Sequence, residues 1–273
     1  MRIYFIILFV CLGISASAQK GNYNLFNPTP KSALREFETD RPTIIESPLT
    51  VDAGHIMYET DIVRFNHQKT EDADTKQWLV NNANIKLGIT NTTDVQLFIQ
   101  SYGIQKDKET IIGNKHISQG FGDIQLRIKQ NIIGNDKGNF ALAVLPYVKF
   151  PTNNYADNKA YEGGVIIPME VKLPGEWKLE LQVEGDRLKD EQDDGYHNEL
   201  MQGAGLSHKI GKSLEAFAET YYTYNFKQHH IYNFMNAELQ YEVTDNFLID
   251  GGVYYGIQKH AEQNYFVGAS FRF

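Results

Sequence analysis

The chain has 273 residues, with 26 Lys and Arg against 34 Asp and Glu and a formal net charge of −8. This acidic balance argues against nucleic acid as a partner, because nucleic acid requires a basic face. The mean hydropathy of −0.41 is that of a soluble protein, but this average is uninformative for membrane β-strands, in which only every second residue is apolar.

The first eighteen residues have the layout of a secretory signal peptide. Arg2 precedes an apolar run over residues 3–14 that is too short for a membrane helix, and small residues lead up to Ala18, near which we expect cleavage. Cys11 is the only cysteine and would leave with the peptide. The mature chain would then have neither disulfides nor thiolate metal ligands. It would carry 25 basic and 34 acidic residues, a net charge of −9.

Residues 19–54 form an irregular segment, because they do not alternate between apolar and polar residues and are interrupted by Pro28, Pro30, Pro42 and Pro48. From about residue 55 the pattern changes to period-2 alternation, which indicates β-strands. The clearest case is 123–132, where apolar residues share one face and Gln125, Arg127 and Lys129 share the other. We predict twelve strands, at 55–65, 77–90, 94–103, 123–132, 139–150, 165–173, 177–186, 197–210, 213–226, 235–243, 246–258 and 264–273.

The connections between these strands alternate in length. Short turns are predicted at 91–94, 134–139, 174–175, 211–212 and 245–246, and longer polar loops at 66–76, 103–120, 151–161, 187–196, 227–231 and 259–263. Outer-membrane barrels have short periplasmic turns and longer external loops. The predicted fold is therefore all-β: a transmembrane antiparallel up-and-down β-barrel of about twelve strands over residues 55–273. We expect residues 19–54 either to lie under it in the periplasm or to fold up into it as a small plug.

Aromatic residues mark the expected membrane interfaces. Trp78 begins a strand beside a long loop and Trp177 begins one beside a short turn, so the two should lie at opposite interfaces. The last strand ends on Phe273 and should close on the first strand. We expect outer-membrane lipid to cover the apolar faces, and the barrel assembly machinery to engage the final strand through Phe273.

Two prolines interrupt the predicted strands at Pro146 and Pro168. Proline has no N–H to donate to a β-ladder and is normally confined to edges or bulges. Unpaired backbone in hydrocarbon costs several kcal/mol. We therefore predict a bulge or ladder break at this pair, facing the lumen or protein rather than lipid.

The polar faces of the strands should line the lumen, and we take their charged residues as candidate solute-binding residues. Acids are in excess among them, so the lumen would favour cations or polar neutral solutes. The alternative is structural, with charges that pair across strands and fill space. The candidates are Asp123, Arg127, Lys129, Glu170, Lys178, Glu180, Glu184, Asp186, Glu238 and Arg272.

No catalytic, metal or cofactor site is predicted. Glu180 and Glu184 lie two alternations apart on one strand, about 13 Å, which exceeds the separation of glycosidase carboxylates. Ser207 and His208 are neighbours in a strand and point to opposite faces. A triad assembled from distant residues would be invisible in the sequence.

Several motifs resemble the family of outer-membrane proteins named for the MetA-pathway of phenol degradation. They are Glu38-Thr39-Asp40-Arg41-Pro42, Glu46-Ser47-Pro48, Gly120-Phe121-Gly122-Asp123, the run from Leu145 to Thr152, and Gly163-Gly164-Val165-Ile166-Ile167-Pro168. The resemblance implies an outer-membrane transporter of a small solute, hydrophobic or aromatic in kind, and provides no catalytic residues. The alternatives are a non-transporting envelope scaffold or adhesin, and a lipid-modifying outer-membrane enzyme.

Overall fold

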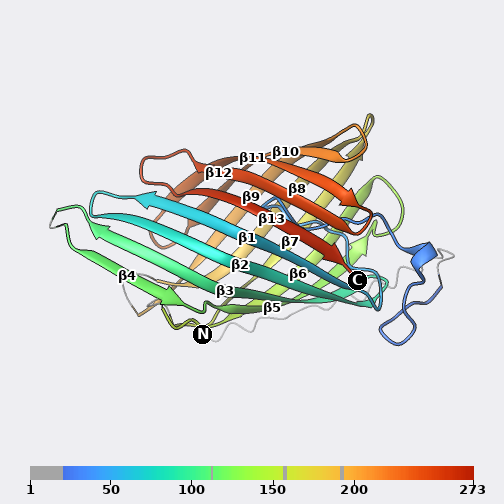
Figure 1. Ribbon diagram of the computed structural model, residues 1–273, viewed down its shortest axis with the longest axis horizontal. Coiled ribbons are helices and arrows are strands. Elements are labelled where there is room, and N and C mark those ends of the chain that lie inside the picture. Colours follow the sequence, from blue (N-terminus) through green and yellow to red (C-terminus); the bar gives the residue numbers. More distant parts are fainter. Residues whose placement is uncertain (1–20, 112, 156–158, 191–193) are drawn as a thin grey trace, which may run out of the picture.

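A computed structural model describes residues 21–111, 113–155, 159–190 and 194–273, so the expected signal peptide lies outside the described residues. Within these ranges the chain forms one 3-10 helix, η1 (Lys31–Ala33), and thirteen strands in a single sheet (Figure 1). The strands are β1 (Ile56–Lys69), β2 (Ala73–Thr90), β3 (Thr93–Glu109), β4 (Lys115–Gly120), β5 (Ile124–Ile133), β6 (Phe140–Phe150), β7 (Glu162–Leu173), β8 (Trp177–Lys189), β9 (Tyr196–Ile210), β10 (Leu214–Asn225), β11 (His230–Thr244), β12 (Phe247–Gly256) and β13 (Gln263–Arg272).

Twelve of these strands close into the predicted antiparallel barrel, and β4 lies outside the ring. Every neighbouring pair is antiparallel, and β13 pairs with β1 from Arg272 opposite Met57 to Gln263 opposite His67. Beyond the last rung, the Phe273 N–H donates to the Ile56 carbonyl at 2.9 Å. The last strand therefore closes on the first, as predicted.

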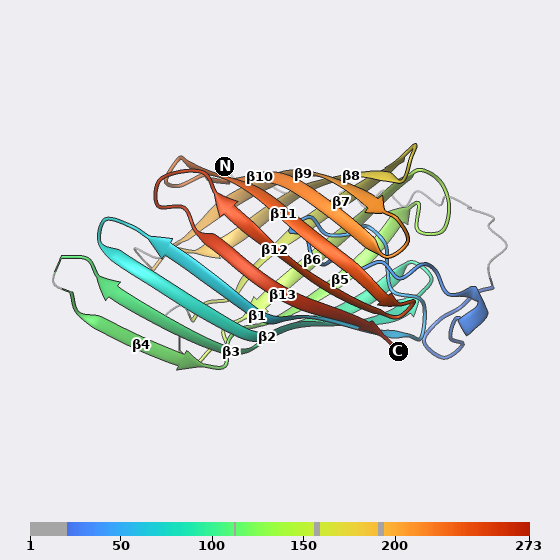
Figure 2. The same ribbon diagram turned by 45° about the horizontal axis from the view of Figure 1, so that its top comes forward.

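Strand β4 corrects the prediction of a long loop at 103–120. It pairs with β3 from Gly103 opposite Gly120 to Lys108 opposite Lys115, in the same register in which β3 pairs with β5. β4 is thus an outward continuation of β5. The expected loop at 66–76 is likewise mostly strand, because β1 and β2 stay paired as far as Lys69 opposite Asp74. Both hairpins project beyond the rest of the wall (Figure 2).

The two prolines interrupt the ladders without a bulge. The register of β6 with β7 is unchanged across both positions, but its pairing skips Ala143 and Val144, and the ladder of β5 with β6 skips Leu145 and Pro146. Pro168 is buried on the inner face, as predicted. The prediction is wrong for Pro146, which is exposed on the outer face. Its missing N–H falls in the gap of the β5–β6 ladder, which accommodates the ring without a change of register.

The two faces of the wall differ as the alternation predicted. Large apolar side chains such as Ile128, Leu239 and Val267 are exposed on the outside, whereas inward charged side chains such as Lys129 and Glu170 are each 1% exposed. Aromatic rings stack where β12, β13 and the C-terminus meet, with Phe247 and Phe271 centroids 4.5 Å apart. No helix in the described ranges is long and apolar enough to cross a membrane.

The irregular chain before β1 packs closely on the end of β2 at Gly88. A Cβ atom at Gly88 would lie 2.1 Å from the carbonyl oxygen of Asp52, which is a backbone atom and cannot move alone. Gly88→Ala should therefore destabilise the folded barrel by about 1–3 kcal/mol in urea unfolding, as overpacking does elsewhere. The matched control is Gly185→Ala, because a Cβ there meets no atom within 4 Å. Equal midpoints for the two variants would contradict the close packing.

Candidate functional site: a charged segment inside the barrel

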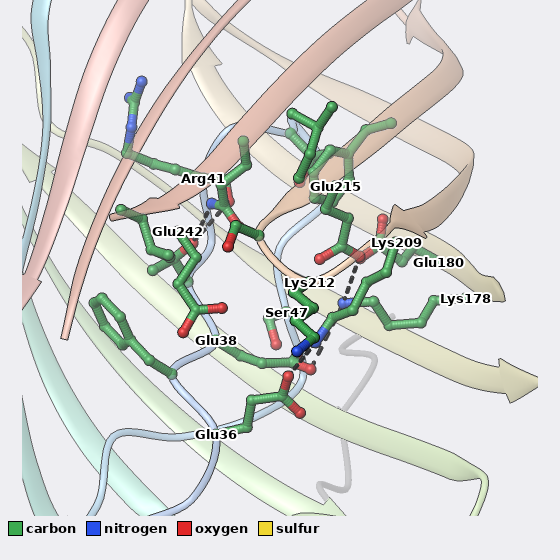
Figure 3. Close-up of a pocket in the computed structure, with 18 residues that line it drawn as sticks. Glu36, Glu38, Arg41, Ser47, Lys178, Glu180, Lys209, Lys212, Glu215 and Glu242 are labelled. Atoms are coloured by element: carbon green, nitrogen blue, oxygen red, sulfur yellow. Dashed lines mark hydrogen bonds and ion pairs between the residues drawn. The ribbon is translucent and has the colours of Figure 1, made fainter. Parts of the chain in front are cut away.

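Residues 36–47, here called the inner segment, run through the barrel lumen and contact strands on opposite walls (Figures 1 and 3). Its beginning is fixed by Arg35, whose Nε donates to Asp52 Oδ1 at 2.9 Å. Within the lumen the Tyr254 hydroxyl on β12 donates to the Pro42 carbonyl. Pro42 is among the most deeply buried residues.

Asp40 is the most strongly paired residue of the inner segment. Its carboxylate accepts from Lys129 Nζ on β5 at 2.6 Å and from Lys86 Nζ on β2, and all three side chains are at most 6% exposed. Lys86 also reaches Glu59 on β1 at 2.5 Å. Burial alone would raise the pKa of Asp40, but Lys129 and Lys86 outweigh it and hold that pKa well below its usual value. Asp40 is therefore ionised and connects three strands.

Arg41 shows the reverse arrangement of charges: it is a cation of the segment held by carboxylates of β1 and β12. Its guanidinium contacts Asp61 on β1 and Asp250 on β12, each at 2.5 Å. Asp61 is shared with Arg64, whose Nε lies 2.8 Å from the second carboxylate oxygen. Neighbouring residues of the segment thus carry opposite charges and pair with opposite charges of the wall.

Glu46 continues this pattern near the end of the segment. Its Oε1 accepts from Arg127 of β5 at 2.6 Å, and its backbone N–H donates to Gln182 of β8 at 2.7 Å. The Arg127 guanidinium also lies over the Phe98 ring, 5.2 Å from its centroid. Burial, together with the neighbouring Asp40 carboxylate, raises the pKa of Glu46 to about 7.

An apolar contact holds the segment against β9. The Ile45 side chain is 1% exposed and lies 3.2–3.3 Å from the positions that Cβ atoms would occupy at Gly203 and Gly205. The backbone N–H of Ile44 donates to Glu219 of β10 at 2.8 Å. A Cβ atom at either position of β9 would require Ile45 to shift by a few tenths of an ångström, so the two glycines allow its close approach.

Cavities border the inner segment inside the barrel, and another, of about 490 Å³, lies at the mouth where Glu36 and Phe37 approach Arg272 and Phe273. The outer cavity, of about 320 Å³, is lined by Arg64, Arg127, Phe98 and Tyr254 among others. The inner cavity, of about 60 Å³, lies beside the segment on the side of the short turns, and Figure 3 shows Lys178, Glu180 and Glu215 around it. Arg41 and Thr43 line both cavities.

The predicted lumen residues separate into three groups. Four contact the chain before β1: Arg127 and Lys129 as above, Lys178 at 3.6 Å from Glu38, and Arg272, whose Nη1 donates to the Arg35 carbonyl at 2.8 Å. Three lie toward the outer end: Asp123, Glu184 and Asp186, the last accepting from Tyr147 at 2.6 Å. Three more, Glu170, Glu180 and Glu238, have buried carboxylate oxygens with no hydrogen-bond donor among the described residues. Their role in binding a solute stays a prediction.

The sequence analysis left residues 19–54 either beneath the barrel or folded into it as a small plug, and it named neither Asp40, Arg41 nor Glu46 among the lumen residues. A signal was present, since this proline-broken segment carries charges of both signs. Alternation reveals only strands, and it does not predict whether an irregular segment lies outside the barrel or inside its lumen. In the described ranges, no group of three or more His, Cys, Asp or Glu side chains is placed to hold a metal ion.

The sequence profile of one protein family, described as "Putative MetA-pathway of phenol degradation", matches residues 39–273. The chain belongs to this family. The match confirms the resemblance of the motifs, and it takes in nearly all of the inner segment as well as the barrel. A search of curated proteins finds no match.

Solved structures resemble this member of the phenol-degradation family in fold. An outer membrane channel from Pseudomonas putida F1 has a TM-score of 0.61 and 11% identity, over 86% of this chain and 100% of the channel. The NanC porin has a TM-score of 0.51 and 12% identity, over 78% of this chain and 98% of the porin. At these identities the likeness establishes the β-barrel fold.

Removal of the Asp40 charge should loosen the segment. Asp40→Asn leaves Lys129 and Lys86 buried with one carboxylate fewer, and breaking a buried pair in this way costs about 3–5 kcal/mol. We expect a lower free energy of unfolding in urea and faster proteolysis of the chain before β1. Glu71→Gln, at a carboxylate 79% exposed, is the control and should change stability by less than about 0.5 kcal/mol. Equal proteolysis of both variants would contradict a clamping role for Asp40.

Glu46 should give the segment a pH dependence. Because the pKa of Glu46 is raised to about 7, the folded protein binds a proton there below about pH 7. The unfolded chain binds that proton only below about pH 4.5, in the ordinary carboxyl range. The contribution of Glu46 is therefore fully present below about pH 4.5 and is lost as the pH rises through 7. The gap in the free energy of unfolding between the native protein and Glu46→Gln should shift in favour of the variant by on the order of 2 kcal/mol from pH 5 to pH 8, in addition to the cost, in the variant, of leaving Arg127 buried without its carboxylate. A gap that is constant with pH would sink this assignment.

Proposed function

We propose that this protein is an outer-membrane channel for passive or facilitated passage of a small solute, and that the inner segment is its gate. The proposal is supported most directly by the inner segment, which lies between cavities in a polar lumen and is held to the wall only by non-covalent contacts. The barrel fold is shared with an outer membrane channel and a porin, which supports placing the proposed channel in the outer membrane.

The contacts of the segment suit a gate more than a permanent filling. They are ion pairs with Lys, Arg and Asp side chains of the wall and hydrogen bonds to its polar side chains, supplemented by the buried apolar side chain of Ile45. Charged groups released from such pairs would face a water-filled lumen and be solvated there. The segment can therefore leave its site without the full cost of exposing an apolar core.

The charge of the lumen favours cations and polar neutral solutes over anions. On β7–β12 the inward carboxylates outnumber the inward cations, and these strands form half of the ring. The carboxylates are Glu162, Glu170, Glu180, Glu184, Asp186, Glu199, Glu215, Glu219, Glu238, Glu242 and Asp250, and the cations are Lys172, Lys178 and Lys209. An uncharged phenolic solute, as the family name suggests, is compatible with this wall and with the guanidinium and aromatic groups of the outer cavity.

A reversible cross-link tests both parts of the proposal. Ile45→Cys with Gly203→Cys should form a disulfide, because the Gly203 Cβ position lies 3.2 Å from Ile45 Cγ1. In planar bilayers we expect the oxidised double variant to conduct several-fold less than its reduced form. Each single-cysteine variant, treated in the same way, should not respond to reductant.

Two results would separate the parts. If native protein that migrates as a folded barrel shows neither conductance nor solute flux, the channel itself is refuted. If the oxidised and reduced forms conduct equally, with the disulfide verified by mass, the channel stands and the inner segment is not its gate.

A further inference from the structure

Four carboxylates form a belt on the inner wall between β7 and β11. Glu170 lies directly opposite Glu180, Glu180 opposite Gly205, and Gly205 opposite Glu219, in the registers of β7–β8, β8–β9 and β9–β10. Glu238 is placed diagonally to Glu219, two residues beyond its partner Asn236. We call these four glutamates the acidic belt. Gly205 lies in its middle, between Glu180 and Glu219, and has no side chain to separate them.

The belt lacks hydrogen-bond donors. Both carboxylate oxygens of Glu170 and of Glu238, and Oε2 of Glu180, have no donor in the described ranges, although these residues are 1%, 3% and 8% exposed. The side-chain oxygen of Asn236 is also without a donor and lies on the same inner face. Glu219 differs, since it accepts from the backbone of Ile44 and from Asn236 Nδ2.

Nearby cations in the described part of the chain donate to none of these acceptors. Lys178, beside Glu180 on β8, is 3.1 Å from Glu215 and 3.6 Å from Glu38 instead. Lys172 approaches Glu170 only to 3.9 Å and is 48% exposed. Buried carboxylates without donors are costly, so a native protein that keeps several on one face has a reason to keep them.

We propose that the acidic belt is a binding site for a linear di- or oligoammonium ion. An ammonium group has three N–H donors and a positive charge. It would therefore supply the hydrogen bonds and the counter-charge that the unpaired carboxylate oxygens do not find among the described residues. Neighbouring strands are about 4.8 Å apart, so Glu180 and Glu219, on either side of Gly205, face one another across a distance that an extended diamine can bridge. A bare divalent metal fits less well, because these carboxylates are not placed to share one ion.

The inner cavity provides the entrance to the belt. Glu180 lines this cavity, whose volume of about 60 Å³ accommodates one ammonium group (Figure 3). The backbone of Ile44 covers Glu219, and the Ile45 side chain covers Gly205. Full occupancy requires the segment to move, so this part of the inference rests on the gate proposed above. The ligand would then stabilise the withdrawn segment.

Calorimetric titration of the folded protein with 1,4-diaminobutane tests the site without any need for conduction. We expect saturable binding that is at least about tenfold weaker in Glu238→Gln and in Glu180→Gln, since each change removes a charge-assisted acceptor. Glu199→Gln removes a carboxylate of β9 six residues from Gly205 and should bind as the native protein does. 1-Aminobutane, with one ammonium group, should bind more weakly than the diamine.

Several results would overturn the site. No heat of binding, equal loss in all three variants, or tighter binding of Mg²⁺ than of the diamine would each refute an ammonium-selective belt. Heat-modifiable gel migration verifies that each variant is folded. If the diamine binds as expected but neither form of the cysteine pair conducts, the site stands and the channel fails. If the channel conducts and the diamine does not bind, only the belt is refuted.

Discussion

Closure of the hydrogen-bonded ring is the constraint on which the remaining structure depends. In lipid every backbone N–H and C=O must be paired, and only a closed barrel satisfies this with strands. Closure of β13 on β1 fixes which residues of each strand face outward. Because outward positions must be apolar, charged side chains are placed inside, and they accumulate there whether or not a solute uses them.

This accumulation creates an electrostatic problem that the inner segment solves on one side only. Asp40, Arg41 and Glu46 each pair with an opposite charge on β1, β2, β5 or β12, so the barrel half that contains these contacts is compensated. The wall from β7 to β11 receives Ile44 and Ile45 through glycines and backbone donors, and its Lys178 and Lys209 pair with Glu38 and Glu36 of the segment. Among the described residues, Glu170, Glu180 and Glu238 on this wall stay short of donors. The segment therefore explains both the compensated half and the half in which these glutamates lack donors.

The alternation predicted the barrel and its inward charges because successive residues of a strand face opposite sides of the sheet, one apolar and one polar. It failed where the period was absent or displaced. β4 was missed because it continues β5 across an interruption at 120–123. Pro146 was placed on the wrong face because its missing N–H falls in a gap of the β5–β6 ladder, where no hydrogen bond is lost. The inner segment has no period at all. Its position inside the lumen follows from ion pairs with wall residues far away in the sequence, and such pairs cannot be predicted from one sequence.

In the proposed channel, transport would be a competition between two sets of charges for the same partners. The inner segment contacts Lys129, Arg127, Asp61 and Asp250 at 2.5–2.6 Å and also pairs with Lys86, and any solute that displaced it would have to replace those contacts or leave them to water. A neutral solute cannot replace them, so under this proposal it would pass only when the segment is already withdrawn. A cation bound to the proposed acidic belt would gain contacts that the segment does not make. Its binding energy would then shift the proposed gate, and a charged ligand would control the passage of an uncharged one.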